Sequence, residues 1–189
     1  MPLLCVAFEG AGCGYGLGMA VTVRAARPDD VPEILSMVRE LAEYERALHD
    51  VQATEHDLTA ALFGAAPAVF CHVAEDDGPD GQQTAGFVLW FLNFSTWLGR
   101  HGIYVEDLYV RPQFRGHGYG RLLLEELART CVERGHGRLE WCVLDWNEPA
   151  LGFYRSLGAT AMDDWTVYRL SGDSLDALGA IDPGPPSIG

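Results

Sequence analysis

The sequence contains no lysine. All thirteen of its basic residues are arginines, against 27 acidic residues and a formal net charge of −14. The absence of lysine excludes a Schiff-base lysine and a nucleotide-binding loop of the Gly-Lys-Ser/Thr type, because both need a lysine amine. A surface this acidic repels nucleic acid and anionic membranes, so we expect neither as a partner.

Paired metal-ligand spacings are also lacking. The five cysteines and six histidines are scattered, with neither a CxxC pair nor an HxxxH pair. We therefore expect no metal site, and we expect free, mostly buried thiols in a reducing compartment, the cytoplasm. No apolar run approaches the length that spans a membrane.

The length of 189 residues fits a single globular domain with less ordered ends. The stretch "GAGCGYGLG" (10–18) is too rich in glycine to offset its ordering entropy, and it lacks both the GxGxxG spacing and the basic front of a secretory signal. The other end, "GAIDPGPPSIG", has the composition of a disordered segment. We interpret residues 1–18 as a flexible leader, 19–175 as the domain and 176–189 as a disordered tail.

Strand and helix patterns alternate within the domain. Apolar alternation or continuous apolar runs predict strands at 21–26, 68–76, 84–94, 102–110, 138–146 and 165–170. Helices are predicted near residues 30 and 54, where Asp30 with Glu33 and Thr54 with Asp57 are spaced as capping boxes. Further helices are predicted after residue 120 and at 147–158. This order predicts a mixed α/β sheet with helices on both faces.

The stretch "RPQFRGHGYG" (111–120) places arginine and glycine between a predicted strand and a leucine-rich helix. Backbone N–H groups and the helix dipole favour an anion at such a helix start. The dinucleotide fingerprint is excluded because position 121 is arginine rather than glycine. What remains is Arg115-x-x-Gly118-x-Gly120, with Arg111 and Arg121 adding positive charge, which indicates a phosphate-binding turn.

This R-x-x-G-x-G turn resembles the acetyl-coenzyme A pyrophosphate motif of the GCN5-related N-acetyltransferases (GNAT). "RELAEYER", "STWLGR", "YVEDLYVRPQFRGHGYG" and "VLDWNEPALGFYRSLGA" extend the resemblance over residues 21–170, to the spermidine/spermine acetyltransferase branch. Ser95-Thr96 stands where polyamine enzymes of that branch carry Asp-Pro, and with "VLDWN" it is more similar to the thialysine N-epsilon-acetyltransferase subgroup. The resemblance implies a GNAT fold, a single mostly antiparallel sheet splayed at the acetyl-CoA site.

Two catalytic residues follow from the resemblance. An alkyl amine has a pKa of about 10.4, so reaching its nucleophilic form at pH 7 costs roughly 4 to 5 kcal/mol. The resemblance places a proton-accepting carboxylate at Glu106, acting through water, while Asp107 points to the opposite face if the strand is regular. Tyr154 is expected to protonate the departing thiolate.

The resemblance also implies binding residues. Acetyl-CoA is expected to contact the end of the strand, the glycine turn and the helix after it, and the start of the last helix: Leu108, Tyr109, Val110, Arg115, Gly116, His117, Gly118, Tyr119, Gly120, Arg121, Asn147, Glu148, Pro149, Ala150 and Tyr154. The amine is expected to contact Tyr44, Glu45, Ser95, Thr96, Trp97 and Glu106.

The sequence therefore predicts an N-acetyltransferase that moves acetyl from acetyl-CoA, its co-substrate, directly to a small primary amine. A thialysine-like amino acid is the first choice, because loss of the acid before Trp97 favours a shorter amine that bears its own carboxylate. The alternatives are a polyamine acceptor, a protein amine, and a non-catalytic acyl-CoA-binding regulatory module. The resemblance also implies a homodimer.

Overall fold

The computed structural model describes residues 20–78 and 81–180. The chain divides into two compact units, the first ending at Gly158 and the second beginning at Ala159. The predicted leader (1–18) lies outside the described residues, as does most of the predicted tail. The first unit holds the sheet and four α-helices, and it contains every residue of the predicted site.

The first unit is built on one five-stranded sheet in the order β1-β2-β3-β4-β5. Its strands are β1 (Ala20–Ala25), β2 (Val69–Gly78), β3 (Gly81–Ser95), β4 (Arg100–Val110) and β5 (Leu139–Glu140). The first four pair antiparallel in succession, and β5 joins β4 in parallel. The expected single mixed, mostly antiparallel sheet is confirmed.

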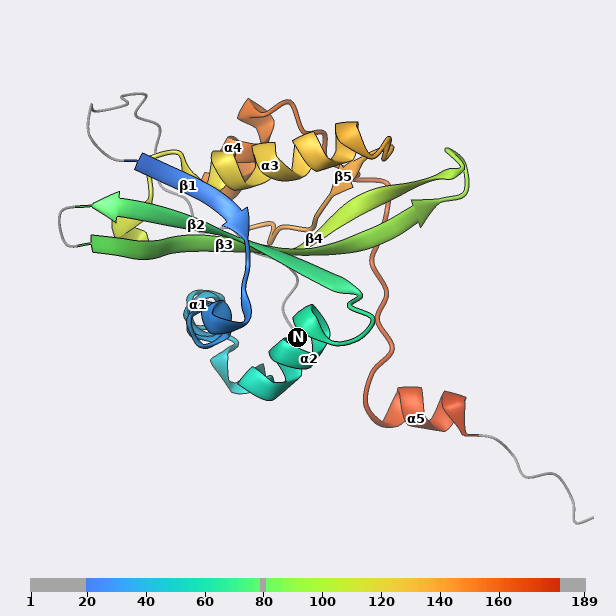
Figure 1. Cartoon of the computed structure of the whole chain (residues 1–189). Coiled ribbons are helices and arrows are strands. Elements are labelled where there is room, and N and C mark those ends of the chain that lie inside the picture. The colour runs from blue at the N-terminus through green and yellow to red at the C-terminus, as the bar shows by residue number, and fades with distance from the viewer. Residues whose placement is uncertain (1–19, 79–80, 181–189) are drawn as a thin grey trace, which may run out of the picture. The chain divides into compact units, whose positions relative to one another are not determined.

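Helices cover both faces of this sheet, as predicted (Figure 1). The helices α1 (Val31–Tyr44) and α2 (Glu55–Phe63) lie on one face, and α3 (Tyr119–Glu133) and α4 (Glu148–Ser156) lie on the other. Short 3-10 turns at Pro28–Asp30, Leu48–Asp50 and Pro112–Phe114 connect them. The apolar side of α1 packs against the face of the sheet that it covers and forms the core there. The core residues include Ile34, Met37, Leu41, Val73, Phe87 and Tyr109.

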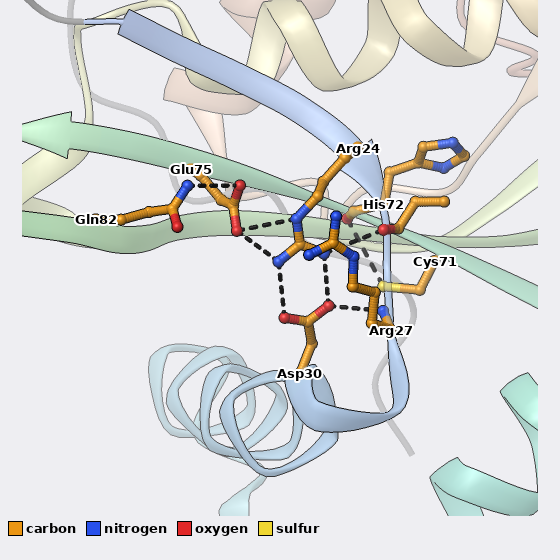
Figure 2. Close-up of polar contacts among 8 residues, drawn as sticks. Arg24, Arg27, Asp30, Cys71, His72, Glu75 and Gln82 are labelled. Atoms are coloured by element: carbon orange, nitrogen blue, oxygen red, sulfur yellow. Dashed lines mark hydrogen bonds and ion pairs between the residues drawn. The ribbon is translucent and has the colours of Figure 1, made fainter.

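A half-buried arginine, Arg24, fixes the start of α1 against the sheet (Figure 2). The guanidinium of Arg24 on β1 donates to Glu75 of β2 at 2.9 Å and to Asp30 at 2.7 and 2.9 Å. Asp30 also accepts from the backbone N–H of Arg27 at 2.6 Å, so its carboxylate is fully engaged there. The predicted capping box of Asp30 and Glu33 is therefore wrong, since Asp30 serves the preceding 3-10 turn.

The second predicted capping box is confirmed at the start of α2. The backbone N–H of Thr54 donates to Asp57 at 2.9 Å, and the N–H of Asp57 donates to the hydroxyl of Thr54 at 3.3 Å. The start of α4 also follows the prediction, because the side chain of Asn147 accepts from the N–H of Ala150 at 3.3 Å. Local side-chain-to-backbone bonds of this kind are readable from the sequence.

Two predicted strands are absent or short. The run 138–146 forms a strand only at Leu139–Glu140, and the described residues after Glu140 follow an irregular path to α4. The run 165–170 forms no strand, and the described part of the second unit holds one helix, α5 (Asp173–Gly179), which crosses the predicted boundary at 175. An apolar pattern shows that a segment could join a sheet, but the partner strand decides whether it does.

Candidate active site

The sheet opens between β4 and β5. These strands pair only at Ile103 with Leu139 and at Tyr104 with Glu140, although β4 continues to Val110. The N–H of Arg111 donates to Ala85 of β3 at 2.9 Å. The backbone N–H and C=O groups of successive residues point to opposite sides of a strand. The N–H and C=O groups of Leu108 and Val110 therefore point away from β3, toward the opening. This edge can pair with an extended ligand as a strand would.

A β-bulge lies in β4 at Glu106. Leu89 of β3 pairs with Asp107, while the next residue, Trp90, pairs with Val105, so Glu106 is the extra residue. A bulge interrupts the alternation of side chains along a strand. Glu106 and Asp107 consequently line the same cavity. The expectation that Asp107 points to the opposite face from Glu106 held only for a regular strand, and the bulge removes that condition.

This first cavity has a volume of about 370 Å³ and lies between the end of α1, the segment after it and β4. Its lining combines apolar side chains with four carboxylates, from Glu45, Asp50, Glu106 and Asp107. Burial raises the pKa of Asp107 to about 7, and the neighbouring charge of Glu106 adds to the effect. The cavity therefore suits a cationic ligand, and it holds a carboxylate able to exchange a proton near neutral pH.

A second cavity, of about 330 Å³, adjoins the same end of α1 and is lined by Glu45, Arg46 and Trp146. Glu45 lines both cavities. The ring of Tyr44 lies 5.9 Å from that of Trp146, between centroids. Of the predicted amine-binding pair, Glu45 lines the same cavity as Glu106. The ring of Tyr44 lies beside Trp146, which lines the second cavity.

The glycine turn has the backbone geometry expected of an anion cradle. Gly116 and Gly118 have φ angles of 79° and 87°, the left-handed region that glycine adopts without strain, and α3 begins directly after them. Backbone N–H groups at this helix start are available to a phosphate. His117 and Gly120 belong to the same turn and first helical turn, and Arg121 is ion-paired to Glu125 at 2.7 Å on the exposed side of α3.

The arginines of the turn differ in what they contact. The Arg115 guanidinium lies 5.6 Å from the ring centroids of both Tyr44 and Tyr109, and its Nε donates to the carbonyl of Val110 at 2.9 Å. Arg111 instead bonds to Glu40 of α1 at 2.8 Å, and to Glu33. The positive charge that the sequence assigns to position 111 is therefore neutralised by α1, and Arg115 is the arginine at the opening.

The start of α4 brings together the last group of predicted residues. Asn147 and Ala150 are fully buried, whereas Glu148 and Pro149 are exposed. Tyr154, one helical turn beyond Ala150, is 5% exposed, and its ring lies 4.7 Å from that of Trp141, between centroids. The helix α4 lies on the face of the sheet that also carries α3 (Figure 1).

Ser95, Thr96 and Trp97 are not brought to either cavity within one chain. They lie at the turn between β3 and β4, where Ser95 pairs with Arg100. Glu106 follows Arg100 by six positions, roughly 20 Å along a strand at about 3.3 Å per residue. Trp97 is 89% exposed.

Sequence reasoning missed Arg46 and Asp50 as residues that line the cavities, and it did not include Asp107 among the site residues. The adjacent acids Glu106 and Asp107 were a visible signal, but the bulge was not. Among the described residues, no group of three or more histidine, cysteine or acidic side chains is arranged to hold a metal ion. In the same residues, no helix has the length and apolar character needed to cross a membrane.

Comparison with known proteins places this geometry in context. A model described as the acetyltransferase (GNAT) family matches residues 34–159. The chain is 38% identical over 165 residues to a thialysine N-epsilon-acetyltransferase of Bos taurus, covering 84% of this chain and 96% of that one. It is 33% identical to an L-ornithine N5-acetyltransferase, NATA1, of Arabidopsis thaliana, covering 86% and 90%.

Solved structures share the fold. An integron cassette protein from the mobile metagenome of V. cholerae superposes with a TM-score of 0.69 at 27% identity, covering 85% of this chain and 98% of that one. The five-stranded sheet with helices on both faces therefore has a known counterpart.

Proposed function

Because this chain belongs to the GNAT family, it transfers acetyl groups from acetyl-CoA to amines, and we propose that its preferred acceptor is a lysine-like amino acid such as thialysine. The observation that carries the proposal is the cavity at the bulge of β4, where Glu45, Glu106 and Asp107 surround a space large enough for a small amine. The similar proteins whose names specify an acceptor include enzymes for thialysine and for ornithine, both amino acids with a side-chain amine.

Acetyl-CoA fits the residues on the other side of the bulge. The outward-directed backbone of Leu108 and Val110 can pair with the pantetheine arm, and the turn at Gly116–Gly120 can hold the pyrophosphate with its N–H groups. Arg115 adds a cation there. We assign Leu108 to Val110, Arg115 to Arg121 and Asn147 to Ala150 to coenzyme binding, with the side chain of Tyr119 turned into the protein.

The chemistry needs a base and an acid. The ammonium group of the acceptor binds the carboxylates, loses a proton to Glu106 through water, and its nitrogen attacks the thioester carbonyl carbon. A backbone N–H from 108–110 stabilises the oxyanion as the tetrahedral centre forms. The C–S bond then breaks, the phenol of Tyr154 gives its proton to the departing sulfur, and the second proton lost by the attacking nitrogen passes through water to restore the phenol. Direct transfer leaves no acyl group on the protein.

Asp107 is a second candidate for the base. Its pKa of about 7 lies where a proton acceptor works best at neutral pH, and the bulge places it in the cavity with Glu106. In this version Glu106 binds the cation and Asp107 takes the proton. The two assignments predict different responses to removing each carboxylate.

A polyamine is the alternative acceptor, favoured by the number of carboxylates around the cavity. The test is release of free thiol from acetyl-CoA with thialysine, lysine, ornithine, spermidine, spermine and a basic peptide, with products identified by mass. Highest kcat/KM for an amino acid supports the proposal, and preference for spermidine or spermine overturns it. Binding of acetyl-CoA with no thiol release on any amine would instead favour a regulatory acyl-CoA-binding module.

We also propose a homodimer in a reducing compartment such as the cytoplasm. Phe94, Trp97 and Leu98 expose 53%, 89% and 50% of their surface at the turn between β3 and β4, which favours a protein contact there. A partner copy seated on this turn would also bring Ser95, Thr96 and Trp97 toward a cavity they do not reach in their own chain. Cys71, Cys131 and Cys142 are free thiols, which suits a reducing environment. Light scattering of the purified chain tests the dimer.

A further inference from the structure

Arg46 has an unusual backbone. Its φ of 62° is the only positive value at a non-glycine residue among the described residues. It follows Glu45, the C-cap of α1, and the next residue, Ala47, donates its N–H to the carbonyl of Ala42 at 2.8 Å. Glycine is the usual residue at such a helix end, because a Cβ is unfavourable in the left-handed conformation. A long charged side chain at this position indicates a use beyond ending the helix.

The charges around Arg46 are almost all negative. It lines the cavity of about 330 Å³ with Glu45 and Trp146, and Glu45 continues into the acidic cavity with Glu106 and Asp107. Of the described residues that line these two cavities, Arg46 is the only basic one.

Arg46 also differs from the other arginines nearby. Arg111 is bonded to Glu33 and Glu40, and Arg115 is bonded to the carbonyl of Val110. Within the described part of the chain, the guanidinium of Arg46 forms no ion pair, and the side chain is exposed. A cation is therefore available for a ligand beside a cavity that otherwise carries acids.

This arrangement matches the two ends of one molecule. A lysine-like amino acid carries an ammonium group at the end of its side chain and a carboxylate at the other end. The acidic cavity suits the ammonium, a guanidinium binds a carboxylate through two parallel hydrogen bonds, and the exposed face of Trp146 can cover the apolar stem. A polyamine has no carboxylate, and its second ammonium group would face the charge of Arg46.

We propose that Arg46 binds the α-carboxylate of the acceptor and thereby selects amino acids over diamines. The inference rests on the proposed function, since it assigns a specificity-determining residue to the same site. It predicts that discrimination depends on a charge at position 46 and is independent of the carboxylates that handle the reacting amine.

The experiment compares lysine with 1,5-diaminopentane, which is lysine without its carboxylate, as acceptors for the full-length protein. Arg46→Gln should lower kcat/KM for lysine roughly 10- to 100-fold, mainly through KM, while kcat/KM for the diamine stays level or rises. Arg46→Gly removes the charge and also removes the strain of a left-handed backbone at a residue with a Cβ. It should therefore lower kcat/KM for lysine but not for the diamine, without loss of stability. Arg129→Gln, on the exposed side of α3, is the matched control and should leave both acceptors unchanged.

An equal fall for lysine and the diamine would overturn the inference, because it would mean a general effect on the site. A higher KM for acetyl-CoA with unchanged lysine KM would also overturn it and would place Arg46 on the coenzyme. The proposed function fails separately, if the unaltered protein prefers polyamines over every amino acid. If the unaltered protein prefers lysine and the Arg46→Gln variant no longer distinguishes lysine from 1,5-diaminopentane, both the proposed function and the inference are supported.

Discussion

The hydroxyl of Tyr119, the first residue of α3, donates a hydrogen bond to the carboxylate of Asp76 on β2, and the two residues are only 2% and 4% exposed. Burial raises the pKa of the Tyr119 phenol, and the bond to the Asp76 carboxylate adds to this, so the phenol stays a donor throughout the neutral range. The bond ties the start of α3 to the sheet at the point where the glycine turn ends. It therefore supports the proposed coenzyme-binding turn through a side chain that is itself buried against the sheet.

Tyr119→Phe should destabilise the protein and loosen the cradle. It leaves the carboxylate of Asp76 buried without this donor, which costs about 1 to 3 kcal/mol in the free energy of unfolding. Urea unfolding measures that loss, and calorimetry with acetyl-CoA should show weaker binding. Asp76→Asn keeps an acceptor for the hydroxyl and should cost less. Unchanged coenzyme affinity in Tyr119→Phe would show that the bond supports only the fold.

Asp107→Asn should stabilise the fold, and more so at higher pH. The pKa of Asp107 is raised from its ordinary value of 3.8 to about 7, so the folded state resists ionisation that the unfolded chain undergoes freely. The resulting loss in the free energy of unfolding is absent below pH 3.8, grows as pH rises, and is complete above about pH 7. The shift of about three pKa units, at about 1.4 kcal/mol each, means that removing this carboxylate should raise the free energy of unfolding by roughly 4 kcal/mol at pH 8.

Urea unfolding of Asp107→Asn and the unaltered protein at pH 5 and pH 8 tests this dependence. The gain in the free energy of unfolding should be clearly smaller at pH 5. Glu133→Gln removes a charge from the exposed end of α3 and should change stability by less than about 0.5 kcal/mol at either pH. A gain in Asp107→Asn that does not vary with pH would contradict the raised pKa.

Much of this site follows from local sequence patterns, and the remainder depends on contacts between distant segments. The glycine turn, the Asn147 cap and the Thr54–Asp57 box each lie within a few residues, so their spacing predicts them. The neutralisation of Arg111 comes from Glu40, 71 positions earlier in the chain. No local pattern around Arg111 shows that acid.

The bulge at Glu106 and the short β5 are also long-range properties. Both depend on the register between neighbouring strands, which is set by the whole sheet rather than by either strand alone. The left-handed backbone of Arg46 could not be predicted either, because glycine is the residue that indicates this conformation in a sequence. Family resemblance named Glu106 and Tyr44 as site residues, but it could not supply the geometry that adds Asp107 and Arg46 to the lining of the cavities.

Glu106→Gln should shift the pH–rate profile toward higher pH. If Glu106 is the base, its loss lowers kcat/KM at pH 7 by roughly 10²- to 10⁴-fold. The deficit should narrow toward pH 9.5, where more of the amine has lost its proton to solvent. The measurement is kcat/KM for lysine between pH 6.5 and 9.5 in Glu106→Gln and Asp107→Asn. A shifted profile in Asp107→Asn alone would assign the base to Asp107 and leave Glu106 as the binder of the cation.

Tyr154→Phe should separate chemistry from coenzyme binding. The ring of Tyr154 is buried against Trp141, and phenylalanine preserves that packing while removing the phenol. If the phenol protonates the departing thiolate, kcat should fall roughly 100-fold or more, while the dissociation constant of acetyl-CoA changes little. Thiol release gives kcat, and calorimetry gives the dissociation constant. Parallel losses in both quantities would mean that Tyr154 positions the coenzyme instead. An acyl donor with a more acidic leaving thiol should then distinguish the two roles, because it needs less help from an acid and should restore turnover only if proton donation was lost.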